Sequence, residues 1–67
     1  MEEQEVIQKS AADAAELCQQ GNLKFSSGRF LEAMSLYNKA LMTASPEDPA
    51  RARYLCNRAQ CHARKGL

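Results

Sequence analysis

Three cysteines and one histidine are the residues of this sequence with the widest range of chemistry. Thiolates and imidazoles bind zinc, and both occur in nucleophilic active sites. Cys56 and Cys61 are five residues apart, and five residues of a helix turn through about 500°, which directs the two thiols about 140° apart. His62 follows Cys61 directly, so its side chain points elsewhere. The sequence has no CxxC or HxxxH pair, and we expect buried thiols, no metal site and no cofactor.

Other catalytic signals are missing from the sequence as well. It has no glycine-rich phosphate loop, and no serine, histidine and acid that spacing could unite into a catalytic set. The arginines between residues 51 and 64 form a loose basic face without interleaved aromatic residues. We interpret that face as solvated and expect no nucleic-acid partner. The sequence therefore predicts a protein that is not an enzyme.

The charges are balanced in number but not in position. Nine basic and eight acidic residues give a net charge of +1, which gives no reason to expect a polyanionic partner. Residues 1–16 contain five acidic residues and one lysine, a balance of −4, whereas residues 49–67 contain five basic residues and no acid. One interpretation of this distribution is that acidic residues near one helix N-terminus and basic residues near another helix C-terminus complement the helix dipoles. The alternative interpretation is head-to-tail self-association, in which the acidic end of one copy contacts the basic end of another.

Composition limits the fold class and the compartment. The 67 residues are 45% hydrophobic and include eleven alanines but only three β-branched residues, so we predict one small all-α domain. No apolar run approaches the roughly 18 residues of a membrane span, and the acidic start MEEQE lacks the features of a signal peptide. With the odd number of cysteines, these features predict a cytoplasmic protein without a membrane partner.

Glycine, proline and capping residues divide the chain into three predicted helices, at about residues 10–26, 29–43 and 49–65. Ser10 is a possible N-cap of the first helix, and Gly28 is placed to end it in a left-handed conformation. Asp48 followed by Pro49 is a strong start signal for the third helix, and Gly66 is its expected C-cap. Apolar stripes on the first two helices predict an antiparallel hairpin. Its core is predicted to consist mainly of the large side chains Leu17, Phe25, Phe30, Tyr37 and Leu41.

An internal repeat relates the first predicted helix to the third. Aligning Gly28 with Gly66, 38 residues later, also aligns Leu17 with Leu55 and Cys18 with Cys56. A period in the thirties that contains a helix, a tight glycine turn and a second helix is typical of a helical-hairpin solenoid. The small residues at the expected helix crossing are Gly21, Ala33 and Ala40.

In these residues the sequence resembles the tetratricopeptide repeat family. The resemblance covers residues 14–67 and divides the chain into an acidic extension at 1–13, a first repeat at 14–47 and the first helix of a second repeat at 48–67. We expect this chain to be the opening segment of a longer protein or a short product of one. The resemblance implies a protein-interaction module.

The segments GNLKF at 21–25 and CNRAQC at 56–61 are similar to those of co-chaperone repeats that bind the C-terminal tails of heat-shock chaperones. By this resemblance Asn22 and Asn57 match two asparagines that bind the peptide, and Cys18 stands where a lysine is usual. The alternative is that both asparagines satisfy neighbouring backbone groups or face water. The resemblance thus implies a peptide partner, and we expect an acidic tail to bind weakly because no lysine stands at residue 18.

A second hypothesis is self-association. In such a solenoid the third helix packs between two neighbours, so one of its faces would need a partner that this chain does not supply. The residues of that face are Leu55, Ala59, His62 and Ala63. A second copy could cover them and form a homodimer.

Overall fold

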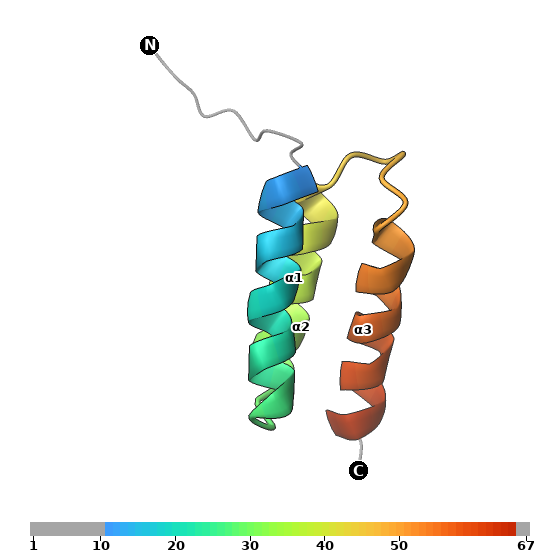
Figure 1. The fold of residues 1–67 in the computed structure, drawn as a ribbon. Coiled ribbons are helices and arrows are strands. Elements are labelled where there is room, and N and C mark those ends of the chain that lie inside the picture. The colour runs from blue at the N-terminus through green and yellow to red at the C-terminus, as the bar shows by residue number, and fades with distance from the viewer. Residues whose placement is uncertain (1–10, 66–67) are drawn as a thin grey trace.

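The computed structural model describes residues 11–65, which form three helices and no strand (Figure 1). These are α1 (Ala11–Ser26), α2 (Phe30–Thr43) and α3 (Arg51–Lys65). The predicted all-α hairpin with a third helix is confirmed, although α2 starts one residue and α3 two residues later than expected. The predicted caps Ser10 and Gly66 lie outside the described residues. None of the three helices is both long enough and apolar enough to span a membrane.

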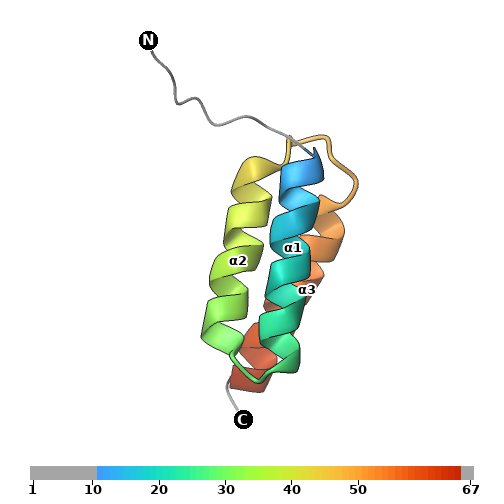
Figure 2. The same cartoon turned by 60° about the vertical axis from the view of Figure 1, so that its left-hand side comes forward.

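The helices lie side by side, and α2 packs against both of the others. Helices α1 and α2 form an antiparallel hairpin, and α3 runs beside it in the same direction as α1 (Figures 1 and 2). The last turn of α3 therefore lies at the same end of the molecule as the tight turn between α1 and α2.

The turn between α1 and α2 is a Schellman motif centred on Gly28. Gly28 has a φ of +80°, as predicted. Its N–H donates to the carbonyl of Phe25 (3.0 Å), and the N–H of Arg29 donates to the carbonyl of Lys24 (2.9 Å). These two bonds satisfy carbonyls that the end of α1 would otherwise leave unpaired. A Cβ at this position would have open space around it, so packing does not require glycine here. The positive φ does, because residues with a Cβ rarely adopt it.

Small residues let α1 and α2 approach closely. Ala33 and Ala40 are fully buried, and Gly21 lies against the ring of Tyr37. A Cβ on Gly21 would be only 2.7 Å from Cε1 of that ring. The prediction that small residues occupy the helix crossing is therefore confirmed.

Polar contacts connect the end of α2 to the start of α3. Asp48 accepts two hydrogen bonds: its Oδ1 from the N–H of Ala50 (2.9 Å) and its carbonyl from the N–H of Arg51 (3.0 Å). This confirms the capping role predicted for Asp48. Nη1 of Arg51 donates to the carbonyl of Leu41 (2.8 Å), one of the carbonyls that a helix end cannot pair internally.

The core differs in composition from the prediction. Tyr37 and Leu41 are buried, but Leu17, Phe25 and Phe30 are half-buried and pack at its edge. The centre consists mostly of small side chains with two tyrosines. Its buried residues are Ala14, Cys18, Ala33, Tyr37, Ala40, Leu41, Ala44, Tyr54 and Cys61.

Helix α3 directs two adjacent residues in different directions. Tyr54 is buried against the hairpin, whereas Leu55 is 43% exposed. The other members of the predicted self-association face, Ala59, His62 and Ala63, are exposed as well. Cys56 is also exposed, so the expectation of a buried thiol is wrong there, because α3 turns Cys61 rather than Cys56 toward the core.

Candidate binding site on the α1–α3 face

All three residues predicted to contact a peptide come together between α1 and α3. Cys18 and Asn22 lie on α1, one turn apart, and Asn57 faces them from α3. Nδ2 of Asn57 donates to Sγ of Cys18 (3.6 Å) and lies 3.4 Å from Oδ1 of Asn22. The three residues and Tyr37, described next, are called the amide cluster below.

Tyr37 positions Asn22 from the core side. Its ring is 1% exposed, and its hydroxyl donates to Oδ1 of Asn22 at 2.6 Å. A buried hydroxyl needs such a partner, because burying it unpaired is costly. Burial raises the pKa of Tyr37 from 10.0 to about 12, so the hydroxyl is a donor throughout the neutral range. The sequence identified Tyr37 only as a core residue; its position opposite Gly21 was the available signal for this second role.

Two polar groups of the amide cluster have no partner within residues 11–65. Oδ1 of Asn22 accepts from Tyr37 and Asn57, and Nδ2 of Asn57 donates to Cys18 and Asn22. Within residues 11–65, Nδ2 of Asn22 and Oδ1 of Asn57 have no hydrogen-bond partner. Asn22 is exposed and Asn57 is half-buried. The site therefore offers one amide donor and one carbonyl acceptor to a molecule outside.

Cys18 gives its end of the amide cluster no charge. The side chain is 5% exposed, and its sulfur is a weak acceptor for the amide of Asn57. A lysine at this position would place an ammonium beside the two amides. The existing residue instead joins α1 to α3 through a contact between neutral groups, its sulfur and the amide of Asn57.

Aromatic rings and a cation lie one turn further along α1. The rings of Phe25 and Phe30 meet edge to face, with centroids 5.2 Å apart and an interplanar angle of 69°. The guanidinium of Arg64, on the last turn of α3, lies over the ring of Phe25, 5.5 Å from its centroid. Such cation–π contacts hold a guanidinium in place without neutralising its charge. The α1–α3 face therefore has neutral amides at its centre and a positive charge near the turn.

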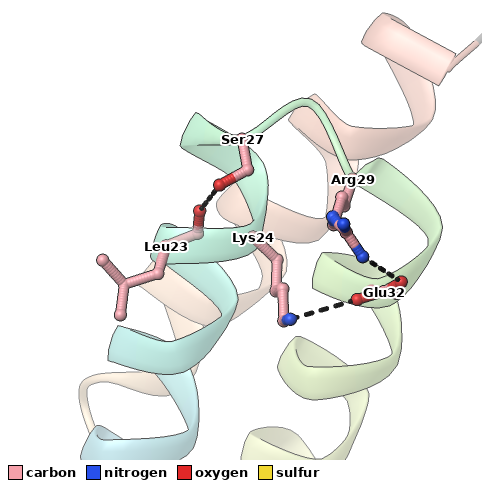
Figure 3. A network of polar contacts seen from close by, with 5 residues as sticks. All are labelled: Leu23, Lys24, Ser27, Arg29 and Glu32. Atoms are coloured by element: carbon pink, nitrogen blue, oxygen red, sulfur yellow. Dashed lines mark hydrogen bonds and ion pairs between the residues drawn. The ribbon is translucent and has the colours of Figure 1, made fainter.

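A polar network closes the hairpin beside this face. Nζ of Lys24 and Nη1 of Arg29 each lie 3.3 Å from a different carboxylate oxygen of Glu32, and Ser27 donates to the carbonyl of Leu23 (Figure 3). A hydrogen bond from Lys24 is the main cause that lowers the pKa of Glu32. The carboxylate of Glu32 is therefore already paired with two cations, Lys24 and Arg29.

The solvated face predicted for the arginines of α3 is only partly present: Arg53 and Arg64 are exposed, whereas Arg51 and Arg58 are half-buried. Arg51 donates to the carbonyl of Leu41, and Nη1 of Arg58 donates to Oδ1 of Asn38 (2.7 Å). Both arginines therefore join α3 to α2, and Arg64 contacts Phe25. Packing at a helix interface allows this, because long basic side chains bury their stems while their charged ends reach polar groups.

The remaining two thiols and the imidazole all lie on α3. Burial raises the pKa of Cys61, which keeps its thiol protonated and unreactive. Cys56 and His62 are exposed on α3. Among residues 11–65, no three or more histidine, cysteine or acidic side chains are grouped so that they could hold a metal ion.

Comparisons of the chain with protein-family models, with curated proteins and with solved structures find no match. Any function must therefore be inferred from the residues and from their geometry. Within residues 11–65, the amide cluster is where the residues selected by the sequence motif lie together.

Proposed function

We propose that this chain is a peptide-binding module of the tetratricopeptide type, and not an enzyme, which binds an extended peptide on the α1–α3 face. The observation that supports this most directly is the pair of groups in the amide cluster that have no hydrogen-bond partner within residues 11–65. Nδ2 of Asn22 and Oδ1 of Asn57 belong to side chains that approach to 3.4 Å. Together they can donate to the carbonyl and accept from the N–H of a peptide backbone.

The other contacts of the amide cluster support binding because they fix the two side chains before a ligand arrives. Tyr37 and Cys18 each bond to one of the asparagines, so little side-chain freedom is lost on binding. Each neutral hydrogen bond contributes only about 0.5–1.5 kcal/mol. Two such bonds give weak binding unless other residues of the peptide contribute.

The partner suggested by the sequence resemblance is the C-terminal tail of a heat-shock chaperone. The neutral thiol of Cys18 offers no charge-assisted hydrogen bond to the carboxylates of such a tail. We therefore expect a tail peptide to bind with low affinity. Chemical-shift titration of the isotopically labelled chain suits that range, and it also reports where the peptide contacts the protein.

Asn22→Asp is the decisive variant because it separates binding from folding. The carboxylate still accepts from Tyr37 and Asn57, but the amide donor is lost and a negative charge replaces it. We expect the midpoint of thermal unfolding to stay close to that of the original chain, while the peptide-induced shifts disappear. Gln20→Glu is the matched control, since it makes the same chemical change at an exposed position of α1. Equal peptide binding by Asn22→Asp and the original chain would overturn the proposal.

Self-assembly is a second candidate function, which the outward face of α3 favours. Leu55 and Ala59 lie one turn apart on this face and are both exposed, and alanine lets a second helix approach closely. Helix α3 contains five basic residues, counting four arginines and Lys65, and no acid. Two α3 helices would therefore repel each other, whereas the acidic start of α1 in a second copy would attract α3.

Light scattering over a concentration series tests this second function. Association should weaken as salt is added, because screening acts on the attraction between exposed charges. Leu55→Asp should dissociate the assembly, whereas the control Leu23→Asp, at an exposed position of α1, should leave it intact. A strictly monomeric mass at millimolar concentration would refute self-assembly.

A further inference from the structure

Arg64 and Lys65 are cations without an acidic partner among residues 11–65. Helix α3 itself contains no acidic residue. The contact of Arg64 with Phe25 places its guanidinium at the end of the α1–α3 face nearest the turn, where its N–H groups remain available. A cation held in position in this way is suited to bind an anion from outside the chain.

An open pocket of about 490 Å³ lies next to Arg64, between the last turn of α3 and the first turn of α2. Arg64, Lys65 and Arg29 contribute positive charge to its wall, and Phe30 and Leu31 contribute apolar surface. Glu32 also lines the pocket, but its carboxylate is already paired with Lys24 and Arg29 (Figure 3). Three cations against one carboxylate make the lining net positive, and their position beside Phe30 and Leu31 suits a carboxylate on a short apolar stem.

The distance between this cation and the amide cluster can be expressed in peptide residues. Asn57 and Arg64 are seven residues apart on α3, which is two helical turns, so both lie on the same face about 10 Å apart along the axis. An extended peptide advances about 3.3 Å per residue. In a peptide held by the amide cluster, the residue that reaches Arg64 would therefore be three positions from the peptide group that the cluster binds.

We propose that Arg64, assisted by Lys65, selects peptides with a carboxylate three residues away from the peptide group that Asn22 and Asn57 bind. This inference rests on the proposed function and specifies its ligand. The guanidinium donates two N–H groups to the carboxylate in a charge-assisted pair. The side-chain stem of the acidic residue contacts Phe30 and Leu31 in the pocket. A glutamate side chain and a free C-terminus supply the same chemistry.

Matched peptides test the selection. An eight-residue alanine–serine peptide, acetylated and amidated, is made with one central glutamate, with glutamine instead, and with glutamine and a free C-terminus. Each is titrated into the labelled full chain at low salt. We expect the glutamate peptide to bind roughly two- to five-fold more tightly than the glutamine peptide, and high salt to remove the difference. Tighter binding by the free C-terminus instead would assign the carboxylate to a chain end and equally support selection by Arg64.

Two variants locate the effect. Arg64→Gln should remove the preference for glutamate, whereas Lys39→Gln, which removes one charge from an exposed position of α2, should retain it. The spacing is tested by N-methylating each residue of the glutamate peptide in turn. N-methylation removes the peptide N–H group that would donate a hydrogen bond to Oδ1 of Asn57. The loss of affinity should be greatest when the methylated residue is three positions from the glutamate.

The outcomes separate this inference from the proposed function. Equal binding of the glutamate and glutamine peptides, with shifts at Asn22 and Asn57, would overturn the role of Arg64 and leave the peptide site standing. Equal weakening of both peptides by Arg64→Gln would also overturn it, since that result shows only a packing role against Phe25. Peptides that bind without shifting Asn22 or Asn57 would overturn the proposed function itself.

Discussion

Gly21→Ala tests how closely α1 and α2 approach each other. The new Cβ would lie 2.7 Å from Cε1, 2.9 Å from Cδ1 and 3.1 Å from Cζ of Tyr37. Carbon atoms in ordinary contact are about 3.5–4.0 Å apart, so the ring or a helix must shift. The ring has little room to move, because it is buried and its hydroxyl is bonded to Asn22. The substitution therefore forces the two helices apart.

The expected cost is the difference between two effects. Overpacking a buried site costs about 1–3 kcal/mol, and two contacts below 3.0 Å place this site in the upper half of that range. Replacing glycine by alanine inside a helix returns about 1 kcal/mol. The net loss is about 1–2 kcal/mol, which in a domain of this size lowers the unfolding midpoint by roughly 5–15 °C.

A double-mutant cycle with Tyr37→Leu assigns this loss to the contact. Thermal and urea unfolding of the four chains give the free energy of each step. With the ring gone, Gly21→Ala should become neutral or stabilising, because only the gain in helix propensity remains. The same loss in both backgrounds would refute the reasoning, as would stabilisation of the original chain by Gly21→Ala. Gln20→Ala, an exposed neighbour, is the control for propensity alone.

Two further predictions concern the contacts around this crossing and the join to α3. The pKa of Tyr37 is raised from 10.0 to about 12 in the folded chain, so above pH 10 the unfolded chain loses this proton more readily than the folded one. The contribution of Tyr37 to the free energy of unfolding is therefore complete below pH 10, and roughly 3 kcal/mol of it is lost between about pH 10 and 12. Urea unfolding across that range should show a smaller loss for Tyr37→Phe; an equal loss would exclude this cause. Arg51→Gln removes the donor to the carbonyl of Leu41. It should lower the free energy of unfolding by about 1 kcal/mol, because Arg51 is only half-buried. An exposed control, Arg53→Gln, should leave the unfolding midpoint unchanged.

Local chemistry explains why the helices could be predicted. Gly28 ends α1 by a backbone conformation that few other residues adopt, and Asp48 starts α3 by accepting an N–H two residues later. These signals act within a few residues, so they can be recognised without knowing the fold. The inward faces of α1 and α2 follow equally from the spacing of small and apolar residues.

The orientation of α3 followed only from the solenoid pattern, which left Leu55 on the face without a partner, and not from local signals. Tyr54 and Leu55 are adjacent apolar residues about 100° apart on the helix, and the apolar pattern permits either of them to face the hairpin. Contacts with distant residues decide between them. Tyr54 packs into the core and Leu55 stays exposed, and in this orientation Arg51 and Arg58 bond to α2.

The contacts inside the amide cluster also depend on the fold. The family resemblance selected Cys18, Asn22 and Asn57, but it gave no reason for Tyr37 to join them. That contact follows from the crossing: Gly21 admits the ring of Tyr37, whose hydroxyl then needs an acceptor, and Asn22 follows Gly21 directly. The residue expected to hold a ligand therefore also holds the two helices together.

Cys18→Lys tests whether the amide cluster is arranged as the resemblance implies. The side chain at residue 18 is buried and accepts from Asn57, so the substitution removes an acceptor and should lower the free energy of unfolding by about 1–2 kcal/mol. The lysine stem is long enough to bring its ammonium out beside the two amides.

In a folded Cys18→Lys chain, that ammonium should tighten binding of an acidic chaperone-tail peptide by about 1–3 kcal/mol, and added salt should weaken the gain. Cys18→Met provides the matched control, because it has similar length without charge. Titration calorimetry on the three chains distinguishes the alternatives. A gain for lysine alone would mean that ligand carboxylates lie beside residue 18, whereas no gain, or an equal gain for methionine, would mean that Asn22 and Asn57 serve only to join α1 to its neighbours.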